Sequence, residues 1–530
     1  MSRAPAALAV PHEHASAQDW LAVFAGALGA LIASLDISIV NSALPQIQGE
    51  IGATGTEGTW IGTGYLVSEV VMIPLSAWLS RMLGMRTLLL TCSTLFTAFS
   101  LLCALSLNLP MMIIGRVGQG FFGGALIPTA QTIVRTRLPA HQIPVGMTMF
   151  GLIVLLGPLV GPVLGGWLTE NWSWQWCFLI NLPVAIALVS LLLLGIPHSR
   201  ADLHELVNAD WLGIFGLSVG LSSLTVVLEE GQREQWFQSD LIIALSISAV
   251  IGLGIMMIAQ FTSARPVIKL RLLRNWSYAS VVIIVIAIGM VLYDILYVLP
   301  QFLSVISGYN AEQAGWVLAL SGLPAFLMMP ILPRIIGRAD IRMVVGAGLL
   351  CFAASCFIDI HLTAQSGRAD FVLSQLLRGV GQILSFMPLN QASVGAVSRA
   401  DTADAAGLFN MARNLGGSIG LALLGVFIDR RVELHADNIR ASVSANSALL
   451  QERLAGQAAF FAERSGDLAH GQQQATAQLA LQIHQQAMVM TYSDCFWILG
   501  IGLIVLMPLV LLLRAPPRPV LPATPRAVRA

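Results

Sequence analysis

Six ionisable side chains lie well inside long apolar stretches of the chain: Asp36, Glu69, Arg116, Asp294, Arg378 and Arg413. Asp36 is the most isolated of them, because it follows an uncharged run that begins at Trp20 and is followed by Pro45. A charge at the centre of a hydrocarbon layer costs about 3 kcal/mol or more, so such charges usually pair with one another and serve a function. Three acids and three bases could neutralise one another as fixed salt bridges or as exchanging partners.

A carboxylate that is shielded from water binds its proton more tightly, and a neighbouring Arg opposes this effect. If the Arg moves away, or a cationic ligand takes its place, the proton affinity of the acid changes. This is the chemistry of a proton-coupled exchanger, with Arg116 as the movable partner and Asp36, Glu69 or Asp294 as the acid. A static structural pair is the alternative for each residue.

That alternative is strongest for Arg378 and Arg413, which lie near one end of their spans or in Gly-rich packing segments. Three further acids, Asp359, Asp429 and Asp494, lie near span ends, where we expect them to reach water or lipid headgroups.

The composition is that of a membrane protein. The mean hydropathy is +0.77, with 56% hydrophobic and 11% charged residues, whereas soluble domains carry about a quarter charged residues. Apolar runs long enough to cross a bilayer recur along the chain. They predict an all-α polytopic membrane protein with fourteen transmembrane helices, at 20–44, 58–80, 86–106, 110–134, 144–168, 175–196, 211–229, 240–262, 276–302, 314–336, 341–361, 370–396, 405–429 and 493–514.

Basic residues test this count through the positive-inside rule. With the N-terminus in the cytoplasm, eighteen Arg and Lys fall in the cytoplasmic tails and loops, and the short loops on the other side hold only Arg233 and Arg368. We therefore expect a multi-pass membrane protein with both termini cytoplasmic. Residues 430–491 form a long polar connection on the outer side whose apolar residues recur at helical spacing, which predicts a projecting helical hairpin or a solvated spacer.

The fifth span repeats Gly-Pro at an interval of four, at Gly157-Pro158 and Gly161-Pro162, followed by Gly165-Gly166. Glycine permits close approach of helices, and proline removes a backbone hydrogen bond and kinks the helix. The doubled pattern indicates a bent, closely packed helix with a specific role. A second Gly-rich run, Gly416-Gly417-Ser418, follows Asn410 and Arg413.

Together these segments resemble the major facilitator superfamily, and within it the fourteen-span drug:proton antiporters of the EmrB/QacA type, closest to the EmrB-like Gram-negative branch. The resemblance covers residues 20–515 and rests on five stretches: Leu35–Pro45, Arg116–Gly120, the doubled Gly-Pro motif, Trp174–Pro183 and Asn410–Ser418. One motif departs from the family pattern. Arg81 stands where the superfamily has the Asp of a cytoplasmic charge latch, and Ala77 replaces its Gly.

The resemblance implies a major facilitator fold of two six-helix bundles plus two extra spans. The cytoplasmic tails would be 1–19 and 515–530. The N-terminal bundle would be 20–196, the extra pair 211–262, and the C-terminal bundle 276–514 with the periplasmic loop 430–491.

It also implies a proton-coupled antiporter that exports amphipathic drugs or toxic small molecules across the bacterial inner membrane, with a periplasmic adaptor and an outer-membrane channel as partners. The proton-coupling residues would be Asp36, Arg116, Glu69 and Asp294, and the candidates for the substrate cavity are Asn41, Tyr65, Tyr293, Tyr297, Trp316, Asn410 and Arg413.

Two other functions remain open. The chain could export a defined endogenous metabolite, such as a siderophore or an aromatic acid, or it could be a non-transporting scaffold or receptor that acts through its outer loop. An enzyme is not expected, because no catalytic, metal-ligand or nucleotide-binding pattern is present, so neither a cofactor nor ATP is predicted.

Overall fold

The computed structural model describes residues 15–197, 201–202, 204–207, 209–263, 265–328, 331–442 and 448–513. Throughout these ranges the regular structure is helical and no β-strand occurs, which agrees with the expected all-α membrane protein. The C-terminal tail expected at 515–530, and residues 1–14 of the N-terminal tail, lie outside the described residues.

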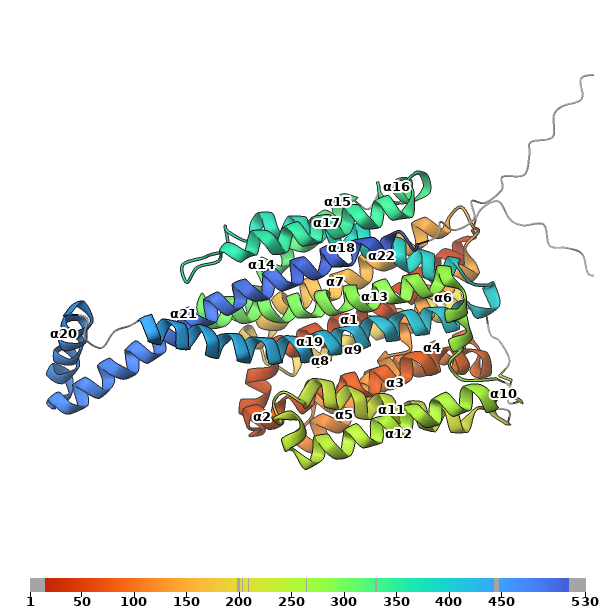
Figure 1. The fold of residues 1–530 in the computed structure, drawn as a ribbon. Helices are drawn as coiled ribbons and strands as arrows, with labels where there is room; N and C mark the ends of the chain where they lie inside the picture. The colour runs from red at the N-terminus through yellow and green to blue at the C-terminus, as the bar shows by residue number, and fades with distance from the viewer. Residues whose placement is uncertain are drawn as a thin grey trace, which may run out of the picture.

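The helices fall into three sets along the chain (Figure 1). The N-terminal helices are α1 (Ala17–Ile51), α2 (Gly55–Gly58), α3 (Trp60–Leu83), α4 (Met85–Ala104), α5 (Leu109–Gly123), α6 (Leu126–Arg137), α7 (Ile143–Asn171), α8 (Trp176–Leu179) and α9 (Asn181–Gly195). Next come α10 (His204–Val207), α11 (Trp211–Glu230) and α12 (Asp240–Thr262). The C-terminal helices are α13 (Trp276–Gln301), α14 (Ala311–Ala319), α15 (Leu323–Met328), α16 (Leu332–Arg338), α17 (Ile341–Ile358), α18 (Val372–Gly395), α19 (Thr402–Ser442), α20 (Ala448–Ser465), α21 (Leu468–Val505) and α22 (Met507–Val510).

Eleven helical stretches in the described residues are long and apolar enough to cross a membrane. The predicted span 110–134 is divided between α5 and α6, and the predicted span 314–336 is divided among α14, α15 and α16. The count of fourteen therefore stays a prediction. The first span is longer than expected, since α1 continues through Pro45 to Ile51 and ends at Gly52, whose φ of 70° is left-handed. A proline can kink a helix without ending it.

The doubled Gly-Pro segment lies in α7, and its glycines form the contact with α1. A Cβ atom built on Gly157, Gly161 or Gly165 would collide with the α1 turn at Ser34, Ser38 or Ser42, respectively. The Ser34 hydroxyl donates to the backbone carbonyl of Val154 across the same interface, at 3.0 Å. The spacing of four places small residues of both helices on facing sides, so the two backbones can touch.

Another side of α7 contacts the C-terminal helices. A Cβ on Gly315 of α14 would lie 2.9 Å from the backbone nitrogen of Val163. Likewise α19 approaches α3, where Gly407 faces the Ile73 carbonyl. The N-terminal and C-terminal helices therefore meet along α7–α14 and α3–α19, and α11 packs against both α3 and α19.

The segment 430–491 is largely helical in the described residues. The last turns of α19, all of α20 and the first turns of α21 project beyond the helix bundle, and α20 folds back on α21 (Figure 1). We call the end of the molecule that carries α20 the hairpin end, and the end that carries α10 and α16 the opposite end.

Candidate functional site

Asp36 and Arg116 form an ion pair that is completely buried. The Arg116 Nη1 atom lies 2.5 Å from the Asp36 Oδ2 atom, and the two side chains are 1% and 0% exposed. Asp36 comes from the middle of α1 and Arg116 from the middle of α5, so packing of these helices brings together residues that are 80 positions apart. Burying two charges is costly unless the pair has good geometry and further hydrogen bonds, and both conditions are met here.

The other oxygen of Asp36 is also fully occupied. Its Oδ1 atom accepts hydrogen bonds from Asn181 Nδ2 at 2.8 Å and from Gln119 Nε2 at 2.9 Å. The hydroxyl oxygen of Ser100 accepts from the same two amide groups, at 2.9 and 3.1 Å, and so holds them in place. Both oxygens of the Asp36 carboxyl group therefore accept hydrogen bonds from side chains of other helices.

Arg116 is also held from two sides by α3. Its Nε atom donates to the Ile61 carbonyl at 3.1 Å, and its guanidinium carbon lies 4.4 Å from the centre of the Tyr65 ring. A cation over an aromatic face is attracted by the ring quadrupole. Tyr65, which the sequence analysis assigned to a substrate cavity, is therefore part of the Asp36–Arg116 site.

Three members of this site are not predicted from the sequence: Ser100, Gln119 and Asn181. Two signals were available, since Gln119 lies one helical turn after Arg116 and Asn181 belongs to the Trp174–Pro183 stretch. Ser100 gives no signal in the sequence, because serine is common in apolar helices.

A largely apolar pocket lies between the N-terminal and C-terminal helices. It receives side chains from α6, α7, α13, α17, α18 and α19, and among the described lining residues only Arg413 is charged. Pro158 of the doubled Gly-Pro segment also lines it. The remaining walls are formed mainly by Phe150, Leu155, Ile288, Phe352, Phe386 and Met387, with Gln131, Gln382 and Asn390 as polar groups. Such a pocket suits an apolar ligand that carries a few polar atoms.

Glu69 and Asp294 are buried, at 2% and 5% exposed, but neither contacts Asp36. Among the described residues no hydrogen bond or ion pair reaches the Glu69 carboxylate, although it interacts electrostatically with Arg413 and Arg116. The Asp294 Oδ1 atom is likewise buried without a hydrogen-bond partner in the described part of the chain, close to Gly420 of α19. Among the described residues, neither carboxylate is therefore neutralised by direct contact with a base.

The remaining cavity candidates separate into two groups. Asn410 is buried and joins α19 to α6 through a 3.0 Å hydrogen bond to Gln131, and Tyr293 donates to Asn414 at 3.2 Å. The other three lie on exposed surface and do not line the pocket: Asn41, Tyr297 and Trp316.

Asp359 differs from the expectation that it reaches water or headgroups. It is 1% exposed and pairs with Arg378 at 2.5 Å, which makes it a second buried carboxylate–arginine pair. Asp494 is 27% exposed, and it also pairs with Arg431 at 2.5 Å and contacts His435 at 2.7 Å.

A cluster of charges at the opposite end joins the N-terminal to the C-terminal helices. Arg81 of α3 lies 3.0 Å from Asp404 of α19, and Lys269 lies 2.8 Å from Asp404 and 2.7 Å from Asp401. The hydrogen bond from Lys269 is the main reason that the pKa of Asp401 is lowered. Arg81, which replaces the expected acid of the latch motif, thus meets an acid supplied by α19.

Known proteins match both the sequence and the fold. The family model described as Major Facilitator Superfamily matches residues 26–421. The colistin resistance protein EmrB of Acinetobacter baumannii is 33% identical over 481 residues, covering 91% of this chain and 93% of its own. The multidrug export protein EmrB of Escherichia coli K12 is 30% identical over 476 residues, covering 89% and 91%.

Among solved structures, the human organic anion transporter MFSD10 (TETRAN) aligns with a TM-score of 0.59 at 14% identity, over 92% of this chain and 99% of that one. The EmrB-like resemblance read from the five sequence stretches is thereby confirmed. Because the family model matches most of the chain and the fold agrees with it, the chain belongs to the Major Facilitator Superfamily and has the fold of a membrane transporter.

Proposed function

We propose that this protein is a proton-coupled antiporter that exports amphipathic small molecules, including drugs, across the bacterial inner membrane. The observation that carries the proposal is the buried Asp36–Arg116 pair, a protonatable group held in the same helix assembly as an apolar pocket. The names of the relatives, a multidrug export protein and a colistin resistance protein, support drugs as substrates.

Asp36 is the proposed proton carrier. While it is ionised, it binds Arg116, Gln119 and Asn181 and holds α1 against α5 and α9. A proton on Asp36 removes the charge that attracts Arg116, so these contacts weaken together and a different packing of α1 becomes favourable. A ligand shifts an equilibrium between two conformations by the difference in its affinity for them. Here the ligand is the proton that binds Asp36.

The doubled Gly-Pro helix gives this change a route to the pocket. The glycines of α7 touch α1 on the turns that flank Asp36, and Pro158 of α7 lines the pocket. A movement of α1 would therefore displace α7 and change the shape of the pocket in which the substrate would lie. Glu69 and Asp294 are proposed as additional acids for the proton or for a positively charged substrate.

We infer the larger architecture from the same family. Fourteen spans would form bundles at 20–196 and 276–514 with the extra pair at 211–262, both termini in the cytoplasm and the hairpin end in the periplasm. The asymmetry of basic residues in the sequence supports this orientation.

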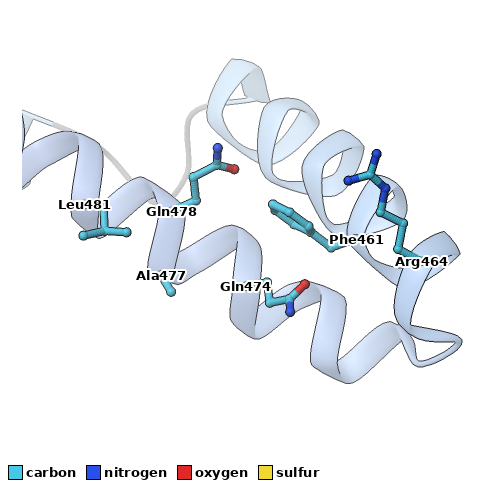
Figure 2. Close-up of a pocket in the computed structure, with 6 residues that line it drawn as sticks. All are labelled: Phe461, Arg464, Gln474, Ala477, Gln478 and Leu481. Atoms are coloured by element: carbon cyan, nitrogen blue, oxygen red, sulfur yellow. The ribbon is translucent and has the colours of Figure 1, made fainter. Parts of the chain in front are cut away.

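The hairpin is the proposed docking element for a periplasmic adaptor, which would connect the pump to an outer-membrane channel. Ala458 and Gly471 allow α20 and α21 to touch, and beside this contact the hairpin holds an open groove (Figure 2). The groove combines the apolar surface of Phe461 and Leu481 with Arg464 and several Gln side chains. Mixed apolar and polar surface of this kind is typical of protein interfaces.

The direct test uses purified protein in proteoliposomes. With a pH gradient imposed, a fluorescent amphipathic cation such as ethidium should accumulate on the side of higher proton concentration, and nigericin, which collapses the gradient, should release it. Equal distribution of ethidium and of other amphipathic probes with and without the gradient would exclude proton-coupled export.

A further inference from the structure

The extra helix α11 places two adjacent carboxylates between the N-terminal and C-terminal helices. Glu230 faces α3, where it accepts from the Thr63 hydroxyl at 2.5 Å and is neutralised by Arg233 at 2.8 Å. Glu229 faces α19, where it accepts from the Ser418 hydroxyl at 2.6 Å. In the described part of the chain no basic side chain lies within ion-pair distance of Glu229, so its charge is not compensated by contact.

Glu229 belongs to a polar cluster built by four helices. Tyr293 of α13 interacts electrostatically with Glu229, with Glu69 of α3 and with Arg413 of α19. The Tyr293 hydroxyl donates to Asn414, and its ring lies against Gly417, where any side chain would collide with it. The absence of a side chain at Gly417 thus makes room for Tyr293 at the centre of the cluster.

Polar groups of the cluster are left without partners among the described residues. The Asn414 Nδ2 atom has no acceptor although the residue is 4% exposed. The Glu69 side chain is 2% exposed, and no hydrogen bond or ion pair reaches its carboxylate in the described part of the chain. Buried polar groups are nearly always hydrogen-bonded, and a carboxylate without a donor is the group that a cation would satisfy. Of the charged members, Glu69 and Glu229 outnumber Arg413, which leaves the cluster able to accept one positive charge.

We propose that Glu229 recognises the positively charged group of amphipathic monocationic substrates, and that the extra helix α11 thereby contributes to the transport site. This inference rests on the proposed export function and specifies its substrate class. Arg413 is common to the cluster and to the apolar pocket. A lipophilic cation can therefore place its apolar body in the pocket and its charge in the cluster, beside Glu229.

The test compares two probes of the same shape and opposite charge, tetraphenylphosphonium and tetraphenylborate, by binding to the purified protein in nanodiscs. Glu229→Gln retains an oxygen for Ser418 but removes the charge, and should weaken tetraphenylphosphonium binding by about tenfold or more. Tetraphenylborate binding should be unchanged or tighter. Ser418→Ala, which removes the hydrogen bond and keeps the charge, should change phosphonium binding by less than about threefold.

Glu234→Gln is the matched control. Glu234 lies four residues after the end of α11 and is 38% exposed, and in the described part of the chain its ion-pair partner is Arg233. It should leave both affinities unchanged. Phosphonium binding that persists in Glu229→Gln, or loss of both probes to the same extent, would overturn the inference. The binding assay needs no pH gradient, so it is independent of the proposed proton coupling. If that coupling is wrong, the probes still bind as expected but no gradient-driven transport is seen in proteoliposomes.

Discussion

Asp36 accepts hydrogen bonds from Arg116, Gln119 and Asn181, which come from two helices other than its own. Each partner satisfies a different part of the carboxylate, so the site is a network and its members are not independent. Removing the base alone leaves a buried charge without a counter-charge, which is far more costly than removing both members of the pair. This difference separates the effects of single and double substitutions.

Arg116→Met should lower the free energy of unfolding by about 3–5 kcal/mol, because it leaves Asp36 unpaired in the protein interior. Adding Asp36→Asn to that variant should restore part of the loss. Thermal unfolding of the two variants in the same detergent gives the comparison. The single variant Asp36→Asn completes the comparison. If Asp36→Asn lowers the stability of Arg116→Met as much as it lowers that of the wild type, the two residues are not coupled.

The charge cluster at the opposite end makes a prediction for pH. Because the hydrogen bond from Lys269 lowers the pKa of Asp401, this pair stabilises the fold fully above the unfolded pKa of about 3.9. The stabilisation is lost as the pH falls through the lower pKa of the folded state. Lys269→Met should therefore lower the melting temperature at pH 7, and the difference from wild type should shrink below about pH 3. A difference that stays constant over this range would contradict the assignment.

At the scale of helices, the contact between α1 and α7 depends on the absence of side chains. A Cβ on Gly165 would lie 2.7 Å from the Ile39 carbonyl oxygen, a backbone atom that cannot turn aside. The helices must then separate, and the neighbouring Asp36 site must distort with them.

Gly165→Ala should therefore reduce both thermal stability and export, the former by about 1–3 kcal/mol as for other overpacked cores. Gly254→Ala is the matched control in α12, because nothing lies within 4 Å of a Cβ at that position. The control should be neutral or slightly stabilising, since alanine favours a helix. Equal losses in the two variants would contradict packing against α1 as the cause, since a Cβ at Gly254 has nothing to collide with.

The helices themselves could be predicted from the sequence, because hydropathy and charge asymmetry report directly on a membrane. The pairing of Asp36 with Arg116 could be predicted too, because isolated intramembrane charges of opposite sign tend to pair. Other contacts between helices that are far apart in the sequence could not be predicted. Arg81 and Asp404 are 323 positions apart, and no local pattern links them. Glu229 could not be predicted as a site residue. It is the second-last residue of α11, and a charge near the end of a span is common; its role depends on the contact with α19.

For the whole molecule, the hairpin and the helix bundle are proposed to have separate tasks. The groove is lined by residues of α20 and α21, and the apolar pocket by residues of α6, α7, α13, α17, α18 and α19. In Figure 1, α20 lies at the end of the projection, far from the labels of α6, α7 and α13. Transport chemistry should therefore not require the hairpin tip, whereas delivery through an adaptor should.

Replacing residues 448–480 by a short Gly-Ser linker should preserve gradient-driven transport in proteoliposomes and abolish drug resistance in cells. The resistance assay is growth in graded drug concentrations, with equal membrane levels of the two proteins as the control. Full resistance in cells without the hairpin would contradict its role as a docking element.

The central claim is that Asp36 couples protons to substrate, and Asp36→Asn in proteoliposomes tests it most directly. The amide retains the size of the side chain but cannot carry a titrating charge. The variant should still exchange labelled for unlabelled substrate across the membrane without a gradient, yet should no longer accumulate substrate when a pH gradient is imposed. Accumulation by Asp36→Asn equal to that of the wild type would contradict the claim.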